Sequence, residues 1–235
     1  AEFLMEDPGD VGPSVWGSAR RCGRPMEIGN IPNLRPGDEH TFMSYDLPWA
    51  NVSNSPFRLF KHWLHEGGIS TPFIANWPSR IDPGRIEHEP VQLVDITATL
   101  IEAARAPFAG ERNGLPVLPL QGESFLPLLE GRKWRKEKPL FWEHEGNRAI
   151  RVGGWKLVSQ QGQPWELYDM YQDRTEIHDL ADKNGPVVRD LEQQYESWAS
   201  ACGVLPWPPG QTEQQLAMKG KHIHLHRHWN RKYIP

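Results

Sequence analysis

The sequence has little cysteine, no long apolar run and no large excess of one charge. It has only two cysteines, Cys22 and Cys202, in 235 residues. Two distant cysteines do not define a disulfide framework, so their pairing stays open. No run of 18 apolar residues occurs, which predicts no membrane span. The net charge is −4, with Lys and Arg spread along the chain, and this predicts no nucleic-acid partner.

The composition is that of a globular protein with many turns. Hydrophobic residues make up 38% and charged residues 24%, which excludes a disordered chain. The chain has 22 prolines and 21 glycines, which predict long irregular connections. Residues 1–55 have little periodicity, and we expect a long loop region there. The start at Ala1 without a Met predicts a cut end, with any targeting segment upstream.

Two kinds of segment are expected between residues 57 and 131. Residues 57–66 predict a short helix or irregular turn ended by Gly67-Gly68, and residues 71–77 are an apolar run typical of a buried strand. Asp95 before an apolar face predicts an N-cap and a helix over residues 95–105. Residues 124–129 predict one helical turn that ends at Gly131.

A second unit begins near residue 139. Short apolar runs alternate with turns up to residue 168, and Gly153-Gly154 between two runs predicts a two-residue hairpin. We therefore expect an antiparallel meander of three or four strands. Apolar residues at helical spacing over residues 186–198 predict a helix packed on one face of this sheet, closed by Gly203.

The segment with the clearest chemical meaning is Lys61 followed, after four residues, by Glu66-Gly67-Gly68. Two adjacent glycines permit unusual backbone geometry or the close approach of a ligand. A lysine just before such a turn can hold an anion such as sulfate or phosphate. Taken alone, the pattern also fits an exposed lysine beside a glycine turn.

The wider pattern resembles the type I sulfatases. Lys61 with Glu66-Gly67-Gly68 is similar to the K-x-x-x-x-E-G-G segment of that family. Other runs that resemble the family follow in the same order, over roughly residues 40–208: Tyr45 to Asn51, Val94 to Leu100, Phe141 to Ala149, Trp155 to Val158 and Trp165 to Ala181.

The resemblance implies a sulfate-ester hydrolase that uses a formylglycine nucleophile and a divalent cation, usually calcium. It makes Lys61 a sulfate-binding residue. From the residues themselves, we expect Glu66, Gly67 and Gly68 to have a structural role in the turn. His62 and His65 flank the motif as substrate-pocket candidates, although side chains on a surface turn are the simpler interpretation. The implied partners are a sulfate ester, aryl or carbohydrate, and the missing N-terminal part of the same protein. A periplasmic or secreted location is the expectation.

The departures from the family are as informative as the matches. The sequence has no C/S-x-P-x-R motif, no adjacent Asp-Asp pair and no Asp-Asn-Gly. We therefore expect that this chain has no catalytic metal ligands and no nucleophile, and that it is inactive alone.

The resemblance also implies a fold and its division. We expect an α/β fold, with residues 1–120 closing an alkaline-phosphatase-like α/β domain. Residues 121–208 should form a C-terminal subdomain of antiparallel sheet and one helix, and residues 209–235 an extended basic, His-rich tail.

Two histidine-containing clusters invite a metal hypothesis. On a strand, Glu143 and Glu145 should share a face while His144 lies on the other, which argues against a shared metal. Four histidines alternate in the tail and could bind a transition metal, although a solvated basic tail is the simpler interpretation: His222, His224, His226 and His228.

Two alternatives to a sulfatase remain at this point. One is a phosphate-ester hydrolase of the same superfamily, which the nucleophile motif would distinguish. The other is a non-catalytic binding module. Exposure of the apolar faces of Phe73 to Trp77 would argue against that module, because such a strand needs sheet neighbours.

Overall fold

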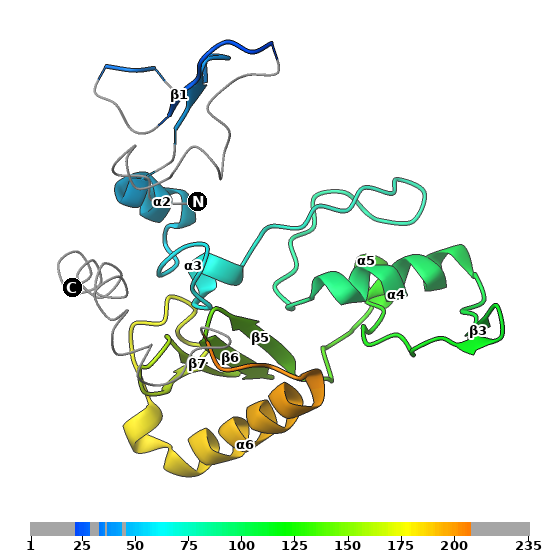
Figure 1. The fold of residues 1–235 in the computed structure, drawn as a ribbon. Helices are drawn as coiled ribbons and strands as arrows, with labels where there is room; N and C mark the ends of the chain where they lie inside the picture. The colour runs from blue at the N-terminus through cyan, green and yellow to red at the C-terminus, as the bar shows by residue number, and fades with distance from the viewer. Residues whose placement is uncertain (1–21, 29–32, 36, 44–45, 208–235) are drawn as a thin grey trace.

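A four-stranded antiparallel sheet forms the centre of the protein in this computed structural model, which describes residues 22–28, 33–35, 37–43 and 46–207 (Figure 1). Its strands pair in sequence order: β5 (Leu140–His144), β6 (Asn147–Val152), β7 (Trp155–Ser159) and β8 (Glu166–Asp169). Val152 pairs with Trp155 across Gly153-Gly154. The predicted meander and its two-residue hairpin are therefore confirmed.

One face of the sheet is covered by helix α6 (Gly185–Cys202), as the sequence predicts (Figure 1). The helix follows the short η1 (Ala181–Lys183) and ends at Gly203, whose φ is 69°. Phe141 of β5 stacks on Trp198 of α6 with ring centroids 4.9 Å apart. The core between them consists of Ile150, Leu157, Leu167, Leu191, Tyr195 and Ala199.

The opposite face of the sheet is covered by residues that precede it by about 80 positions in the chain. Leu64, just before the short helix α3 (Glu66–Ile69), packs against Tyr168 and Met170 together with Ala149 and Val158. The sheet therefore has apolar cores on both faces. The Lys61 motif belongs to the second of these cores.

Helix α4 (Leu93–Ala104) lies beside α5 (Leu126–Leu129). Both predicted helices are present, but Asp95 is the third helical residue and Gln92 is the N-cap. The Asp95 carboxylate accepts the Gln92 N–H at 2.8 Å, which completes a capping box. A small hairpin, β3 (Glu111–Arg112) with β4 (Leu115–Pro116), follows α4.

Two expectations about regular structure are wrong. Residues 1–55 are not all loop, because α2 (Asp46–Asn54) and the parallel pair β1 (Glu27–Ile28) and β2 (Thr41–Phe42) lie there. Residues 71–77 form no strand, and Phe73 and Ile74 are 49% and 88% exposed. A strand needs a neighbour for its backbone hydrogen bonds, and none of the described residues supplies one.

Three further predictions concern membrane helices, the two cysteines and the C-terminal tail. Within the described part of the chain, no helix is both long and apolar enough to cross a membrane. Cys22 and Cys202 are both free and exposed. The tail with its four histidines lies outside the described residues.

Candidate functional site

Lys61 lies on an exposed turn that leads into α3. The turn is irregular, because Leu59 and His62 have φ values of 64° and 101°. Such values are uncommon for residues with a side chain and persist only where surrounding contacts fix them. Lys61 thus places a positive charge at the surface, on a backbone whose conformation is fixed by the surrounding contacts.

Gly67 and Gly68 allow α3 to touch the turn before it. A Cβ on Gly67 would lie 2.1 Å from the Leu59 carbonyl oxygen, and one on Gly68 would lie 2.0 Å from that of Trp63. Gly67 N–H donates to the Arg58 carbonyl at 2.9 Å. The glycines serve close contact between two backbone segments, and instead of ending a helix they lie inside a short one.

Glu66 is held by a buried lysine from the sheet. Lys156 Nζ on β7 lies 3.0 Å from Glu66 Oε1 and 2.7 Å from Glu176 Oε1, and Lys156 is fully buried. The second contact is an ion pair without hydrogen-bond geometry. Glu176 Oε2 also accepts the Glu66 backbone N–H at 2.7 Å. Arg174, 3.7 Å from Glu66, adds a second positive charge.

His65 is part of a second buried network. Its Nε2 lies 3.0 Å from Glu166 Oε2 on β8, and its side chain is 0% exposed. The same oxygen accepts hydrogen bonds from Arg58 Nη1 at 3.0 Å and Tyr168 Oη at 2.6 Å. Nδ1 of His65 has no hydrogen-bond partner among the described residues. This placement indicates that His65 fixes the turn. Its side chain is buried and has no surface that a substrate could contact.

The charge on Glu166 is strongly favoured in this network. Burial alone would raise the pKa of this carboxyl, but hydrogen bonding and charge from His65, together with Tyr168 and Arg58, lower its pKa to about 2. Burial and the hydrogen bond to Glu166 both raise the pKa of Tyr168. The network therefore holds a carboxylate, a guanidinium and a neutral phenol under the Lys61 turn.

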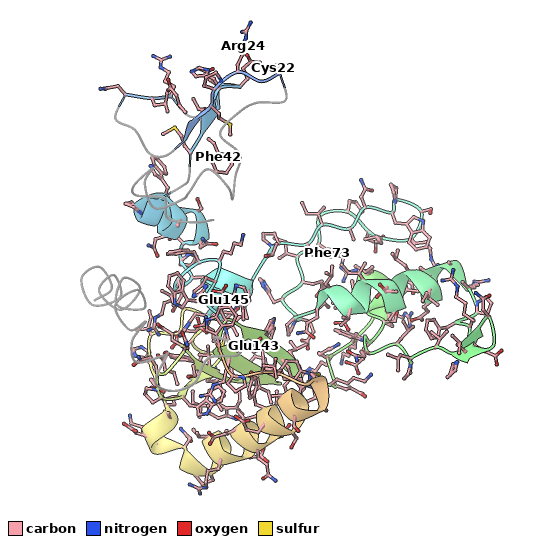
Figure 2. The ribbon with its side chains drawn as sticks, in the orientation of Figure 1. Cys22, Arg24, Phe42, Phe73, Glu143 and Glu145 are labelled. Atoms are coloured by element: carbon pink, nitrogen blue, oxygen red, sulfur yellow. The ribbon has the colours of Figure 1, made fainter. Side chains whose placement is uncertain are left out.

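His62 points to the end of the β5–β6 hairpin. Its Nδ1 lies 2.9 Å from Glu145 Oε2, and its ring centroid is 5.5 Å from that of His144. One ligand atom from each of His62, His144 and Glu145 lies within 4.8 Å of the others. The sequence argument against a metal at His144 and Glu145 used strand alternation. It fails because β5 ends at His144, and Glu145 has a φ of 51° in the turn. Figure 2 labels Glu143 and Glu145 at this end of β5.

The segment that contains these networks matches a known protein family. The model of the family described as "N-sulphoglucosamine sulphohydrolase, C-terminal" matches residues 57–200. The chain belongs to this sulfatase family. The matched region runs from the Lys61 motif through the sheet to α6.

Individual relatives of this sulfatase chain are similar over only part of their length. An uncharacterized sulfatase of Schizosaccharomyces pombe is 32% identical over 186 residues, which cover 76% of this chain and 33% of that protein. An arylsulfatase of Klebsiella aerogenes is 33% identical over 103 residues, 43% of this chain and 22% of that protein. The chain thus spans about a third or less of the length of these relatives.

Among solved structures, the fold is similar to that of a protein named Ps i-CgsB. Its crystal structure matches with a TM-score of 0.53 and 27% identity, over 62% of this sulfatase chain and 32% of that chain. The same protein has been solved in complex with k-i-k-neocarrahexaose, with the same TM-score. The expected fold, the closing part of a sulfatase α/β domain with a C-terminal sheet and helix, is confirmed by these likenesses.

The residues of the Lys61 motif differ in exposure. Lys61 is exposed and His62 partly exposed, whereas His65 and Glu66 are buried beneath them. Sequence reasoning missed Lys156 as the partner of Glu66. The available signal was a lysine within an apolar strand, because a lysine is almost never fully buried unless it is paired.

Proposed function

We propose that this chain is the C-terminal portion of an enzyme that hydrolyses sulfate esters, and that Lys61 binds the sulfate group. The observation that carries the proposal is the exposed cation at Lys61, on a turn that two buried networks fix from below. A fixed positive charge stabilises the negative charge on a transferring sulfuryl group, and electrostatic stabilisation of this kind usually contributes more to catalysis than any other effect. We also propose a domain boundary at about residue 120, on the basis of the resemblance to the type I sulfatases.

In the full enzyme a formylglycine and a metal ion belong to this family's chemistry, and we propose that the metal is calcium. The residues that the structure describes do not form a calcium site. Calcium takes six to eight oxygen ligands, and the only candidate cluster in the described part of the chain has two histidines and one carboxylate. The Asp-Asp pair, Asp-Asn-Gly and C/S-x-P-x-R motifs are absent from the sequence. We therefore propose that the rest of the protein supplies both groups.

Large exposed apolar side chains support a requirement for that remaining part. Ile74 is 88% exposed, Ile86 81% and Leu93 82%, and Phe73, which is 49% exposed, lies on the segment that leaves α3 (Figure 2). Patches of this kind mark surfaces that pack on another protein segment. They argue against a stand-alone binding module. We propose that the N-terminal part of the same protein covers them.

For the substrate we propose sulfate esters in general, with carbohydrate sulfates tested first. The support is the complex of the similar protein Ps i-CgsB with neocarrahexaose. Aryl sulfates are the second class to test, because an arylsulfatase is among the relatives.

The test compares Lys61→Gln with Lys133→Gln in the full-length enzyme. Lys133 is another exposed lysine, outside the motif. Loss of one fixed charge-stabilising group should lower kcat/KM for a sulfate ester by about 10²–10³-fold in Lys61→Gln and leave Lys133→Gln unchanged. Equal activity of the two variants would overturn the role of Lys61. Phosphate esters hydrolysed faster than sulfate esters by the wild type would overturn the reaction class.

A further inference from the structure

The turn after Lys61 and the β5–β6 hairpin place three metal-ligating side chains together. His62 comes from the turn, and His144 and Glu145 come from the end of the hairpin. Their ligand atoms all lie within 4.8 Å of one another. Two imidazoles and one carboxylate are a ligand set that suits zinc and related transition ions, and three protein ligands leave one position open.

A buried asparagine holds the backbones of both histidines. Asn147 is 2% exposed, and its Nδ2 donates to the carbonyls of His62 at 3.2 Å and His144 at 2.9 Å. Its Oδ1 accepts the Gln161 N–H at 3.2 Å. The two segments are therefore fixed to each other before any ion binds. The φ of 101° at His62 belongs to this arrangement.

We propose that His62, His144 and Glu145 bind one divalent transition-metal ion of the zinc type. Zn–N distances of about 2.0–2.1 Å place tetrahedral ligand atoms about 3.3 Å apart. His62 Nδ1 and Glu145 Oε2 are already 2.9 Å apart. His144 is exposed and Glu145 partly exposed, so both side chains have room to rotate towards a shared ion. The ion would join the Lys61 turn to the hairpin.

The experiment measures Co²⁺ binding by its visible absorption in the full-length protein with saturating Ca²⁺, which occupies oxygen-ligand sites. The reference protein carries alanine at four tail positions, because those histidines would also bind Co²⁺: His222, His224, His226 and His228. We expect one saturable Co²⁺ equivalent in the reference, displaced by Zn²⁺, which binds more tightly in the same ligand series.

Three variants made in the reference locate the ion. His144→Ala should weaken Co²⁺ binding at least tenfold, and Glu145→Gln should weaken it by a smaller factor. His88→Ala, an exposed histidine outside the cluster, should leave binding unchanged. Both cluster variants change surface side chains, so folding is expected to persist and is checked by circular dichroism. Absence of saturable Co²⁺ binding in the reference, or equal affinity in His144→Ala and His88→Ala, would overturn the proposal and leave a His62–Glu145 ion pair.

Discussion

Lys156 Nζ lies 3.0 Å from Glu66 Oε1, although 90 positions separate the two residues in the chain. This contact joins β7 to the start of α3, and the Glu176 carboxylate contacts both residues. Burial of three charged groups costs free energy that only mutual pairing offsets. The arrangement fixes the backbone that follows Lys61 against the face of the sheet that Leu64 covers.

Removal of the buried cation should destabilise the protein strongly. Lys156→Met keeps the length of the side chain but removes the cation that Glu66 and Glu176 share, and leaves Glu66 only Arg174 at 3.7 Å. Breaking a buried ion pair in this way costs about 3–5 kcal/mol. The midpoint of urea unfolding measures the effect. Lys133→Met is the control at an exposed position and should change stability by less than about 0.5 kcal/mol. Similar midpoints for both variants would mean that the pairing contributes little.

A methyl group at Gly67 should disrupt the contact between α3 and the turn before it. The added Cβ would lie 2.1 Å from one carbonyl oxygen and 2.4 Å from another, and both belong to the backbone. Neither atom can move without shifting the Lys61 turn, so Gly67→Ala should cost more than about 2 kcal/mol. Gly110→Ala is the matched control, because a Cβ there meets nothing within 4 Å. Thermal unfolding compares the two, and an equal Tm would contradict the close approach.

Local patterns were sufficient to predict the sheet and α6. Short apolar runs, the Gly153-Gly154 turn and an apolar stripe before Gly203 depend on neighbours in sequence, and all three are confirmed. The prediction of a buried strand at residues 71–77 was wrong because it depended on contacts with distant segments. Its apolar character predicts burial, but burial needs a partner segment, and the described residues leave it exposed.

The candidate site was predicted only in part for the same reason. The motif pointed to Lys61 and to a structural Glu66, yet the partner of Glu66 is 90 positions away and no local pattern identifies it. The cluster of His62 with His144 depends on the positive φ of His62 and Glu145 and on the register of β5 with β6. Alternation along a strand stops being informative where the strand ends.

Replacement of Tyr195 by phenylalanine should not weaken the protein. The Tyr195 ring lies in the core under the sheet and is 1% exposed, and its hydroxyl has no hydrogen-bond partner among the described residues. Burial raises the pKa of this phenol to about 12, so it stays neutral. A buried hydroxyl without a partner costs free energy, so Tyr195→Phe should be neutral or stabilising by up to about 1 kcal/mol. Tyr195→Ala should cost about 3–5 kcal/mol through the cavity it leaves. A clear loss of stability in Tyr195→Phe, measured by urea unfolding, would indicate a water-mediated bond to the hydroxyl.

The Glu166 carboxylate should make stability depend on pH in the acid range. Its pKa falls from the ordinary value of 4.5 to about 2 in the folded protein, because His65, Tyr168 and Arg58 outweigh the effect of burial. A carboxyl with a depressed pKa contributes stability that is present above pH 4.5 and is lost as the pH falls towards 2. The contribution is at most about 3 kcal/mol, at 1.36 kcal/mol for each pKa unit.

Glu166→Gln should therefore lower stability at pH 6 and flatten its decline between pH 4.5 and 2. Asp190→Asn, at an exposed position on α6, is the control and should keep the wild-type slope. Urea midpoints measured across this range decide the matter, and an unchanged slope in Glu166→Gln would mean that other carboxylates govern the acid transition.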